Sequence, residues 1–149
     1  MSGVGKSSVI RALASRGLRA IDTDWDPEWE CVGANGDEWV WREDRIRVLL
    51  DEEDADDLFV SACVSNQGKF YDRFNQVILL SAPESVTIQR LANRANNPHG
   101  KKPEEIADVL RYKATVEPRL RHAASAEIDT SIPLEEVVSR VLEISLQRH

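Results

Sequence analysis

The chain begins with Met1-Ser2-Gly3-Val4-Gly5-Lys6-Ser7-Ser8, which matches all but the first glycine of the phosphate-binding motif G-x-x-x-x-G-K-[ST]. Glycines in such a loop allow backbone conformations that a Cβ atom would penalise, so successive N–H groups can point inward around an anion. The motif's lysine reaches the β- and γ-phosphates of a nucleoside triphosphate, and the next serine binds Mg²⁺. The stretch therefore predicts a nucleotide site with cofactor-binding residues Gly3, Val4, Gly5, Lys6, Ser7 and Ser8.

The residues after the motif agree with this prediction. Val9, Ile10 and Leu13 repeat with helical spacing, so a helix should start near Lys6 and direct its positive N-terminal end at the phosphates. The alternative is a glycine-rich turn that only caps this helix. The first glycine, and the strand that normally leads into the loop, would precede Met1. We therefore expect an upstream in-frame extension that supplies this first strand of the sheet.

Size and charge limit the class of protein. The 149 residues suit a single domain over residues 1–149. The net charge of −7, from 19 basic and 26 acidic side chains, argues against a nucleic-acid-binding surface. No apolar run approaches the roughly 18 residues of a membrane span. Cys31 and Cys63 have neither disulfide nor zinc spacing. We expect a cytoplasmic protein that binds no nucleic acid and no membrane.

Short apolar runs alternate with helical periodicities along the chain. The expected strands cover residues 18–21, 58–62, 77–80 and 126–128, and the expected helices cover residues 6–16, 38–53, 83–94, 103–117 and 133–146. Pro118 is expected to interrupt or kink the helix before it. This order predicts an α/β fold of the P-loop NTPase type, a parallel sheet with helices on both faces. Ligands of such sheets bind at the carboxyl ends of the strands.

Asp22-Thr23-Asp24 follows the strand expected at residues 18–21. Phosphoryl transfer needs a metal partner and a group that orients the acceptor hydroxyl, and two carboxylates beside a phosphate loop suit both needs. Neither of the next two apolar strands is followed by an acidic residue that could hold the metal. We therefore expect Ser7 and Asp22 to bind Mg²⁺ and Asp24 to act on the acceptor. The alternative is that the pair only starts a solvated, acidic loop.

Aromatic residues follow this pair, and four tryptophans lie within 17 residues: Trp25, Trp29, Trp39 and Trp41. They either wall an acceptor pocket or form a satellite hydrophobic cluster under a long loop. Trp39 and Trp41, two apart on an expected helix, should not share a face. Arg42 is a candidate to bind an anionic or hydroxyl-rich substrate. The alternative is a surface ion pair with Glu38 or Asp44.

Residues 94–103 contain Asn-Asn-Pro-His-Gly between basic residues and are expected to form a lid. Arg94 and Lys101 on this segment would close over the phosphates and neutralise the charge that develops during transfer. The alternative is ordinary charged surface, with His99 as a solvated loop histidine.

With these motifs in place, the chain resembles the small P-loop kinases of the shikimate kinase, gluconate kinase and adenylate kinase type, which are AAA-type ATP-binding proteins. The resemblance covers nearly the whole chain and rests mainly on the phosphate loop and on Asp22-Thr23-Asp24. It implies ATP and Mg²⁺ as cofactors. It also implies that Asp22 serves the Mg²⁺ shell and that Asp24 holds and activates the acceptor hydroxyl.

Weaker motifs extend the resemblance. Gly36-Asp37-Glu38-Trp39-Val40-Trp41-Arg42 is similar to the family's G-E-x-x-F-R, whose arginine binds substrate. Arg94 lies where the family has a lid arginine near the adenine. Ile128-Asp129-Thr130-Ser131 is similar to the last strand and the adenine-side loop. The resemblance therefore implies that Arg42 binds substrate and that Arg94 and Thr130 bind the nucleotide.

The chain departs from the shikimate kinases in two segments. Residues 62–68 replace a glycine-rich substrate segment, and Val116-Glu117-Pro118-Arg119-Leu120 lacks the second arginine of the family's R-x-P-L-Y. Shikimate itself is therefore not the expected acceptor. In an altered acceptor pocket, Trp41, Asn66 and Gln67 would take the place of a charged clamp.

These observations predict an ATP-dependent phosphotransferase that moves the γ-phosphate to a hydroxyl or phosphate of a small metabolite or nucleotide. Its partners would be ATP and this small-molecule acceptor, and the protein would be a monomer or a homodimer. The alternative is a nucleotide-binding ATPase or regulatory module without an acceptor. A third possibility is an inert fragment, if the strand before Met1 is missing in the cell as well.

Overall fold

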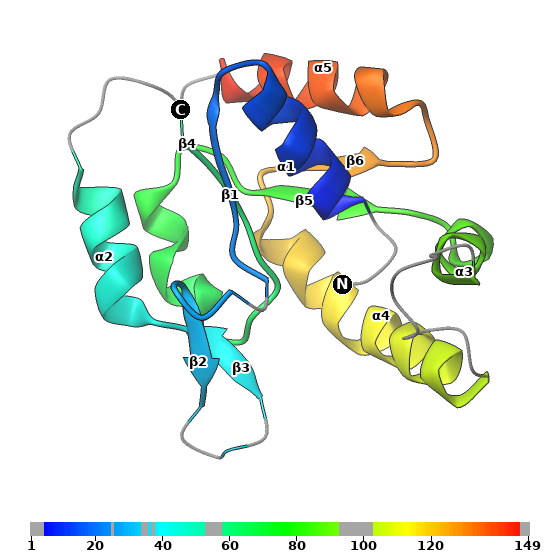
Figure 1. Ribbon diagram of the computed structural model, residues 1–149. Coiled ribbons are helices and arrows are strands. Elements are labelled where there is room, and N and C mark those ends of the chain that lie inside the picture. Colours follow the sequence, from blue (N-terminus) through cyan, green and yellow to red (C-terminus); the bar gives the residue numbers. More distant parts are fainter. Residues whose placement is uncertain are drawn as a thin grey trace. The chain divides into compact units, whose positions relative to one another are not determined.

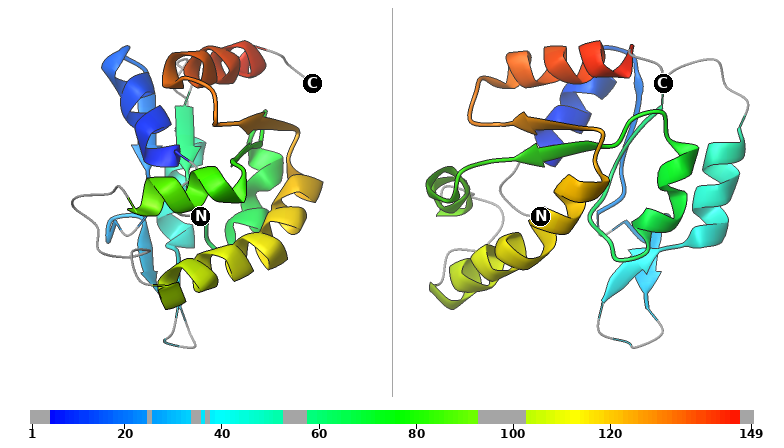
Figure 2. Two further views of the ribbon diagram at one scale, coloured as in Figure 1. Left: turned by 90° about the vertical axis from the view of Figure 1, so that its right-hand side faces the viewer. Right: turned by 180° about the vertical axis from the view of Figure 1, so that it is seen from behind.

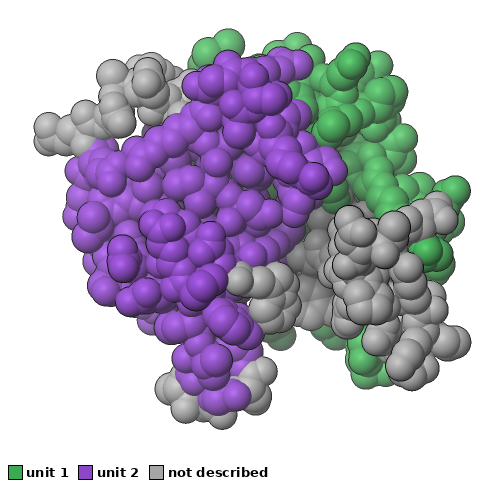
Figure 3. Space-filling view, viewed as in Figure 1, with its two compact units in different colours: residues 1–5, 76–149 green, residues 6–75 purple. Residues whose placement is uncertain are grey.

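The structure is a computed structural model that describes residues 5–24, 26–33, 36, 38–52, 58–92 and 103–146. These residues form an α/β fold in which two pairs of parallel strands are flanked by helices (Figure 1, Figure 2). The chain divides into two compact units (Figure 3). Unit 1 consists of residues 1–5 and 76–149, and unit 2 consists of residues 6–75. No helix among the described residues is long and apolar enough to cross a membrane.

One parallel pair of strands organises unit 2. Helix α1 (Lys6–Ser15) buries its three apolar positions and packs on strands β1 (Arg19–Asp22) and β4 (Leu58–Ser61). The two strands run parallel, in a register that sets Asp22 opposite Ser61. Polar residues from both strands therefore meet at one edge of the sheet. The predicted helix at 6–16 and the predicted strands at 18–21 and 58–62 are confirmed, with ends that differ by about one residue.

The segment after β1 differs from its prediction. The sequence pattern predicts one helix over residues 38–53, but Trp39–Trp41 forms strand β3, paired antiparallel with β2 (Glu30–Val32). Helix α2 covers only Glu43–Asp51. The prediction was wrong because two tryptophans around a valine favour extended backbone, and a local helical pattern does not show the partner strand. Trp39 and Trp41 therefore share a face of the hairpin, since residues two apart in a strand point the same way.

A hydrophobic cluster lies against β4 in unit 2. Its buried members are Trp41, Ile46 of α2 and Phe70 of a 3₁₀-helix, η1 (Gln67–Arg73), and Val60 of β4 packs against them. The rings of Trp41 and Phe70 meet edge to face with centroids 5.8 Å apart, an arrangement that aromatic pairs favour. The structure thus supports the satellite-cluster interpretation for part of the tryptophan-rich segment.

The second parallel pair of strands belongs to unit 1. Strands β5 (Ile78–Ser81) and β6 (Ala126–Asp129) pair in parallel along their whole lengths. Helix α3 (Glu84–Ala92) follows β5, and helix α5 (Leu134–Ser145) lies along the β5–β6 pair (Figure 1, Figure 2). The strands predicted at 77–80 and 126–128 are confirmed, as are the helices predicted at 83–94 and 133–146 over their described residues.

Helix α4 (Pro103–Ala123) continues through Pro118, so the helix is not interrupted there, and the predicted kink stays a prediction. A proline removes the N–H that would bond the carbonyl four residues earlier. Pro118 is exposed, as is Ala114, so water can replace that bond. The Glu117 carboxylate also accepts hydrogen bonds from Lys113 and from Arg121, each over 2.7 Å. These i, i+4 pairs join the turns before and after the proline.

Candidate active site

Lys6, the first residue of α1, forms an ion pair with Asp24, and Nζ lies 2.8 Å from Oδ2. The two side chains are only 14% and 26% exposed, so water screens the pair weakly. Burial lowers the pKa of Lys6, but the charge of Asp24 and its hydrogen bond outweigh burial and leave the pKa above its ordinary value. Lys6 is therefore held in its protonated form, which is the form that can bind phosphate.

Ser7 and Asp22, the predicted metal ligands, lie next to each other. The Ser7 hydroxyl donates to Oδ2 of Asp22 over 2.8 Å, and the Ser61 hydroxyl donates to Oδ1 over 3.2 Å. Each ligand of an octahedral Mg²⁺ ion lies about 2.1 Å from the ion, so neighbouring ligands are roughly 2.9 Å apart. The Ser7 and Asp22 oxygens have a similar separation. No group of three or more His, Cys, Asp or Glu side chains among the described residues could hold a metal. Two protein oxygens suit Mg²⁺, which keeps water and phosphate as its other ligands.

Thr23 fixes the turn that presents the two carboxylates. Its side chain is fully buried, and its N–H and hydroxyl both donate to the carbonyl of Ser61, over 3.1 and 2.9 Å. The Trp41 indole donates to the Thr23 hydroxyl over 2.9 Å. Asp22 and Asp24 stand on either side of this anchored residue, and the Asp24 N–H donates to Oδ1 of Asp22 over 3.1 Å. The carboxylates are thus held by the cluster beneath them, which pre-organises the site.

Asn66, a predicted substrate-binding residue, pairs with the backbone of Trp41. Its amide accepts from the Trp41 N–H and donates to the Trp41 carbonyl, both over 3.0 Å, as a neighbouring strand would. The amide also donates to Glu43 over 3.1 Å. This bond, and then the one from Lys69, hold the pKa of Glu43 below its ordinary value. Asn66 therefore supports the edge of β3, and its contact with substrate stays a prediction.

Gln67 and Arg42 also bond to groups of unit 2. Gln67 accepts from the N–H of Val64 over 3.0 Å and donates to the hydroxyl of Tyr71 over 2.6 Å. Arg42 donates to the carbonyl of Pro27 over 3.3 Å. Either side chain would have to exchange these bonds in order to bind substrate. A contact of Gln67 or Arg42 with substrate therefore stays a prediction.

Unit 1 carries the last glycine of the phosphate loop and the predicted adenine-side residue. Gly5 has a φ of +92°, a backbone angle that residues with a Cβ atom rarely adopt. This agrees with the loop motif. Thr130, which follows β6, is 4% exposed, and its N–H and hydroxyl donate to the carbonyl of Ser81 over 2.7 and 3.1 Å. Arg90 of α3 donates to the Thr130 hydroxyl over 2.8 Å. The sequence pattern places Arg90 only beside the expected lid and gives no sign of this contact.

Comparisons with known proteins identify the family and the fold. A family model described as AAA domain matches residues 1–111, well over half of the chain. The chain belongs to the AAA domain family. Among solved structures, this AAA domain is similar to a shikimate kinase from Acinetobacter baumannii in complex with shikimate, with a TM-score of 0.60 and 20% sequence identity. The match covers 97% of this chain and 90% of that chain, and it shows a shared P-loop kinase fold. No curated protein matches this AAA domain.

Several predicted site residues of this AAA domain lie outside the described residues. They are Gly3, Val4, Trp25, Arg94 and Lys101, and His99 lies outside the described residues as well. The lid predicted at 94–103 falls almost wholly among them. Ser8 is described and lies exposed in the first turn of α1. The roles of all these residues stay predictions.

Sequence reasoning missed the part that Ser61 plays in this AAA domain. Its hydroxyl bonds Asp22, and its carbonyl anchors Thr23. A usable signal was present, because Ser61 is a polar residue near the end of an otherwise apolar run, where β4 reaches the ligand edge of the sheet. No local signal exists for the bond from Trp41 to Thr23, which joins residues 18 positions apart.

Proposed function

We propose that the protein binds Mg²⁺-ATP and transfers the γ-phosphate to a hydroxyl or phosphate of a small metabolite or nucleotide. The observation that carries this proposal is the pairing of Lys6 with Asp24 beside the pairing of Ser7 with Asp22. Two phosphate-loop residues thereby meet two carboxylates at the carboxyl ends of β1 and β4, where ligands of parallel sheets bind. The P-loop kinase fold and the AAA domain family support the same reading.

Each residue has a chemical role in this proposal. The ammonium of Lys6 and the backbone N–H groups of the phosphate loop bind the phosphates and stabilise the charge that develops on them. Ser7 and Asp22 would hold Mg²⁺, which supplies neutralisation of charge on the β- and γ-phosphate oxygens. With Lys6 on phosphate, Asp24 would be free to accept the proton of the acceptor hydroxyl.

With a hydroxyl acceptor, the transfer replaces one phosphorus–oxygen bond by another. The acceptor oxygen forms a bond to the γ-phosphorus, the bond from that phosphorus to the β,γ-bridging oxygen breaks, and the acceptor proton passes to Asp24. The products are ADP and the phosphorylated acceptor. We include Arg94 and Lys101 of the expected lid, Thr130 on the nucleotide side, and Arg42 on the acceptor side as predicted contributors.

A second candidate is a nucleotide-binding ATPase or regulatory module without an acceptor. The observation in its favour is that Asn66, Gln67 and Arg42 already bond to other groups of unit 2. Water would then take the place of the acceptor hydroxyl.

Calorimetric titration of Mg²⁺-ATP into the wild-type chain and its Lys6→Ala variant tests the phosphate site. We expect binding to weaken at least about a hundredfold in Lys6→Ala, because the loop loses its only side-chain cation. Lys69→Ala is the matched control, since Lys69 is exposed and forms its ion pair with Glu43. Equal affinity in wild type and Lys6→Ala would reject the site.

ATP turnover with and without a panel of hydroxyl and phosphate acceptors then separates the two functions. A phosphorylated product that forms only with one class of acceptor supports the kinase. Steady ATP hydrolysis that no acceptor changes supports the ATPase.

A further inference from the structure

The stretch from the end of β1 to the start of α2 is strongly acidic. Residues 22–44 hold nine Asp or Glu side chains and one basic side chain, Arg42, so this stretch has a net charge of −8. It contains Asp24, the residue proposed to act on the acceptor, and it includes the whole β2–β3 hairpin. An acceptor that approaches Asp24 therefore meets a negative electrostatic potential.

Nucleotide binding would leave Asp24 without its cation. The Lys6 ammonium lies 2.8 Å from Oδ2 of Asp24, and the aspartate side chain is 26% exposed. Under the proposed function Lys6 turns to phosphate, and the carboxylate then has no nearby positive charge. A negatively charged acceptor would be repelled by this weakly screened group, since like charges across a contact lower affinity. A positively charged acceptor would restore the charge balance.

Three basic side chains in or against the acidic stretch are bonded to other groups. Arg47 and Lys69 both pair with Glu43, over 3.3 and 3.1 Å. Arg42 donates to the carbonyl of Pro27 over 3.3 Å. An anionic acceptor could recruit Arg47 or Lys69 only by displacing a carboxylate. These cations therefore give unit 2 no ready site for an anion.

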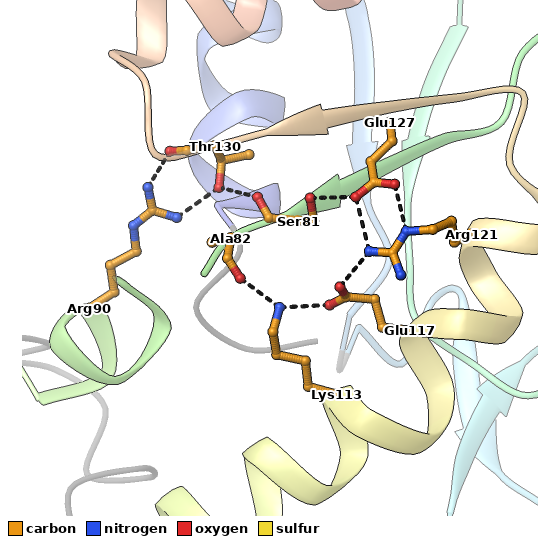
Figure 4. A network of polar contacts seen from close by, with 8 residues as sticks. All are labelled: Ser81, Ala82, Arg90, Lys113, Glu117, Arg121, Glu127 and Thr130. Atoms are coloured by element: carbon orange, nitrogen blue, oxygen red, sulfur yellow. Dashed lines mark hydrogen bonds and ion pairs between the residues drawn. The ribbon is translucent and has the colours of Figure 1, made fainter. Parts of the chain in front are cut away.

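Two cations of helix α4 in unit 1 are bound in the same way. Lys113 donates to the carbonyl of Ala82 over 2.6 Å and to Glu117 over 2.7 Å (Figure 4). Arg121 donates to Glu117 and to Glu127, each over 2.7 Å (Figure 4). Glu117 is only 7% exposed, so removing either partner would leave a buried carboxylate with less compensation. These cations are held within unit 1 rather than offered to a ligand.

The hairpin adds an aromatic face to the acidic stretch. Trp39 and Trp41 lie on the same face of β3, and the buried Trp41 indole bonds to Thr23, the neighbour of Asp24. Trp39 is half-buried, and its cross-strand partner Val32 is 52% exposed, so the outer part of this face is open to solvent. Aromatic faces and carboxylates both attract ammonium groups.

We propose that the phosphate acceptor is a hydroxyl compound that carries a protonated amine, such as an amino sugar or an amino alcohol. This proposal rests on the proposed function and narrows it to a hydroxyl acceptor with a positive charge. Neutral hydroxyl compounds are weaker acceptors, and carboxylates and phosphates are the weakest. The selection comes from the charge of residues 22–44 and from the lack of an available cation around them.

Three sugars with one pyranose ring and different charges test this order: glucosamine, glucose and glucuronate. The test measures kcat/KM with Mg²⁺-ATP at about pH 6.5, where the amine is protonated. It also follows binding by tryptophan fluorescence with Mg²⁺ and the non-hydrolysable ATP analogue AMP-PNP. We expect glucosamine to exceed glucose and glucose to exceed glucuronate, with at least about tenfold between the two ends. This preference should shrink between about 20 and 500 mM NaCl, because salt screens charge.

Variants outside the proposed catalytic residues separate charge from shape. Glu28→Gln combined with Glu38→Gln removes two charges of the acidic stretch and should reduce the preference for glucosamine over glucuronate about twofold for each charge. Asp51→Asn removes one charge at the other end of α2, where Asp51 pairs with Arg73, and should leave the preference unchanged. Trp39→Leu should weaken glucosamine more than glucose, since it removes the aromatic face.

The outcomes separate this proposal from the proposed function. Glucuronate used as well as or better than glucosamine overturns the acceptor class and leaves the kinase in place. Equal responses to the three sugars, absent responses included, overturn it as well, as does a glucosamine preference that salt does not change. Absence of AMP-PNP binding by the folded wild-type chain overturns both proposals together. If the variants do not fold, the salt dependence of the wild-type preference still decides the question.

Discussion

The hydroxyl of Ser7 donates to Oδ2 of Asp22 over 2.8 Å, which joins the phosphate loop to the end of β1. Asp22→Asn keeps the shape of the side chain and removes its charge. We expect the Mg²⁺ concentration for half-maximal turnover to rise at least about tenfold, since even indirect contacts to a metal have effects of this size. Turnover measured against free Mg²⁺ checks this. Asp26→Asn in the same turn is the control, and an identical Mg²⁺ curve for Asp22→Asn would contradict the metal role.

Asp24→Asn should separate catalysis from binding and change the pH dependence of binding. Turnover should fall about 10²- to 10⁴-fold, the usual contribution of a general base, while ATP affinity near neutral pH falls much less. Burial lowers the pKa of Lys6, and the charge of Asp24 and its hydrogen bond raise it. Without Asp24 the pKa of Lys6 should fall, so ATP affinity should weaken at a lower pH than in wild type.

Calorimetric titrations between about pH 7 and pH 10 check this shift. Asp26→Asn again serves as the control, because Asp26 accepts a hydrogen bond from the N–H of Glu28 in the next turn. Equal losses of turnover and of affinity in Asp24→Asn would deny Asp24 the acceptor role, and parallel pH curves would deny its effect on Lys6.

Trp41→Phe should lower the free energy of unfolding by about 1–2 kcal/mol, because it removes the indole bond to the buried Thr23 hydroxyl but keeps a ring against Phe70. Trp29→Phe makes the same change of ring in the same cluster without a bond to Thr23, and should cost less. Urea unfolding of both variants checks the difference. A larger loss in Trp29→Phe would show that packing, and not the hydrogen bond, dominates at this position.

Protonation of Glu127 at acid pH should lower the free energy of unfolding of the chain. Hydrogen bonds from Arg121 and then from Ser81 hold the pKa of Glu127 below its ordinary value of 4.5. A carboxylate with a lowered pKa in the folded state contributes stability above its unfolded pKa, and this is lost as the pH falls through the folded pKa. The difference in unfolding free energy between wild type and Glu127→Gln should therefore be full near neutral pH and shrink below about pH 4.5.

Unfolding of both chains by urea between about pH 3 and pH 7 measures this difference. Arg121→Gln removes the other partner and should show the same convergence. A constant difference across this range would mean that the Arg121–Glu127 pair does not contribute to stability.

The parallel strands β4 and β5 could be predicted from the sequence because each contains a short apolar run, whereas β6 has Glu127 between Ala126 and Ile128. Leu58–Ser61, Ile78–Ser81 and Ala126–Asp129 all lie within a residue or two of their predicted positions. The β2–β3 hairpin could not be predicted in the same way, since its strands have three residues each and depend on pairing across a turn. Local periodicity carries no information about such a partner.

The candidate site could also be predicted only where local sequence carries the signal. Lys6, Ser7, Asp22 and Asp24 were predicted from a motif and a strand end, and the structure brings them together in pairs. Their support by Thr23 and Trp41 depends on a contact across the fold. The clamp of Arg90 on Thr130 joins residues 40 positions apart, and no spacing rule anticipates it.

Glu117 and Pro118 have a consequence for how this chain can diverge. The carboxylate that accepts from Lys113 and Arg121 joins the turns on either side of a residue that helices normally reject. If Glu117 were replaced first, Pro118 would remain in the helix without the hydrogen bonds that join the turns on either side of it. If Pro118 were replaced first, the helix would lose nothing. Among descendants of this sequence, we therefore expect the proline to disappear before the glutamate.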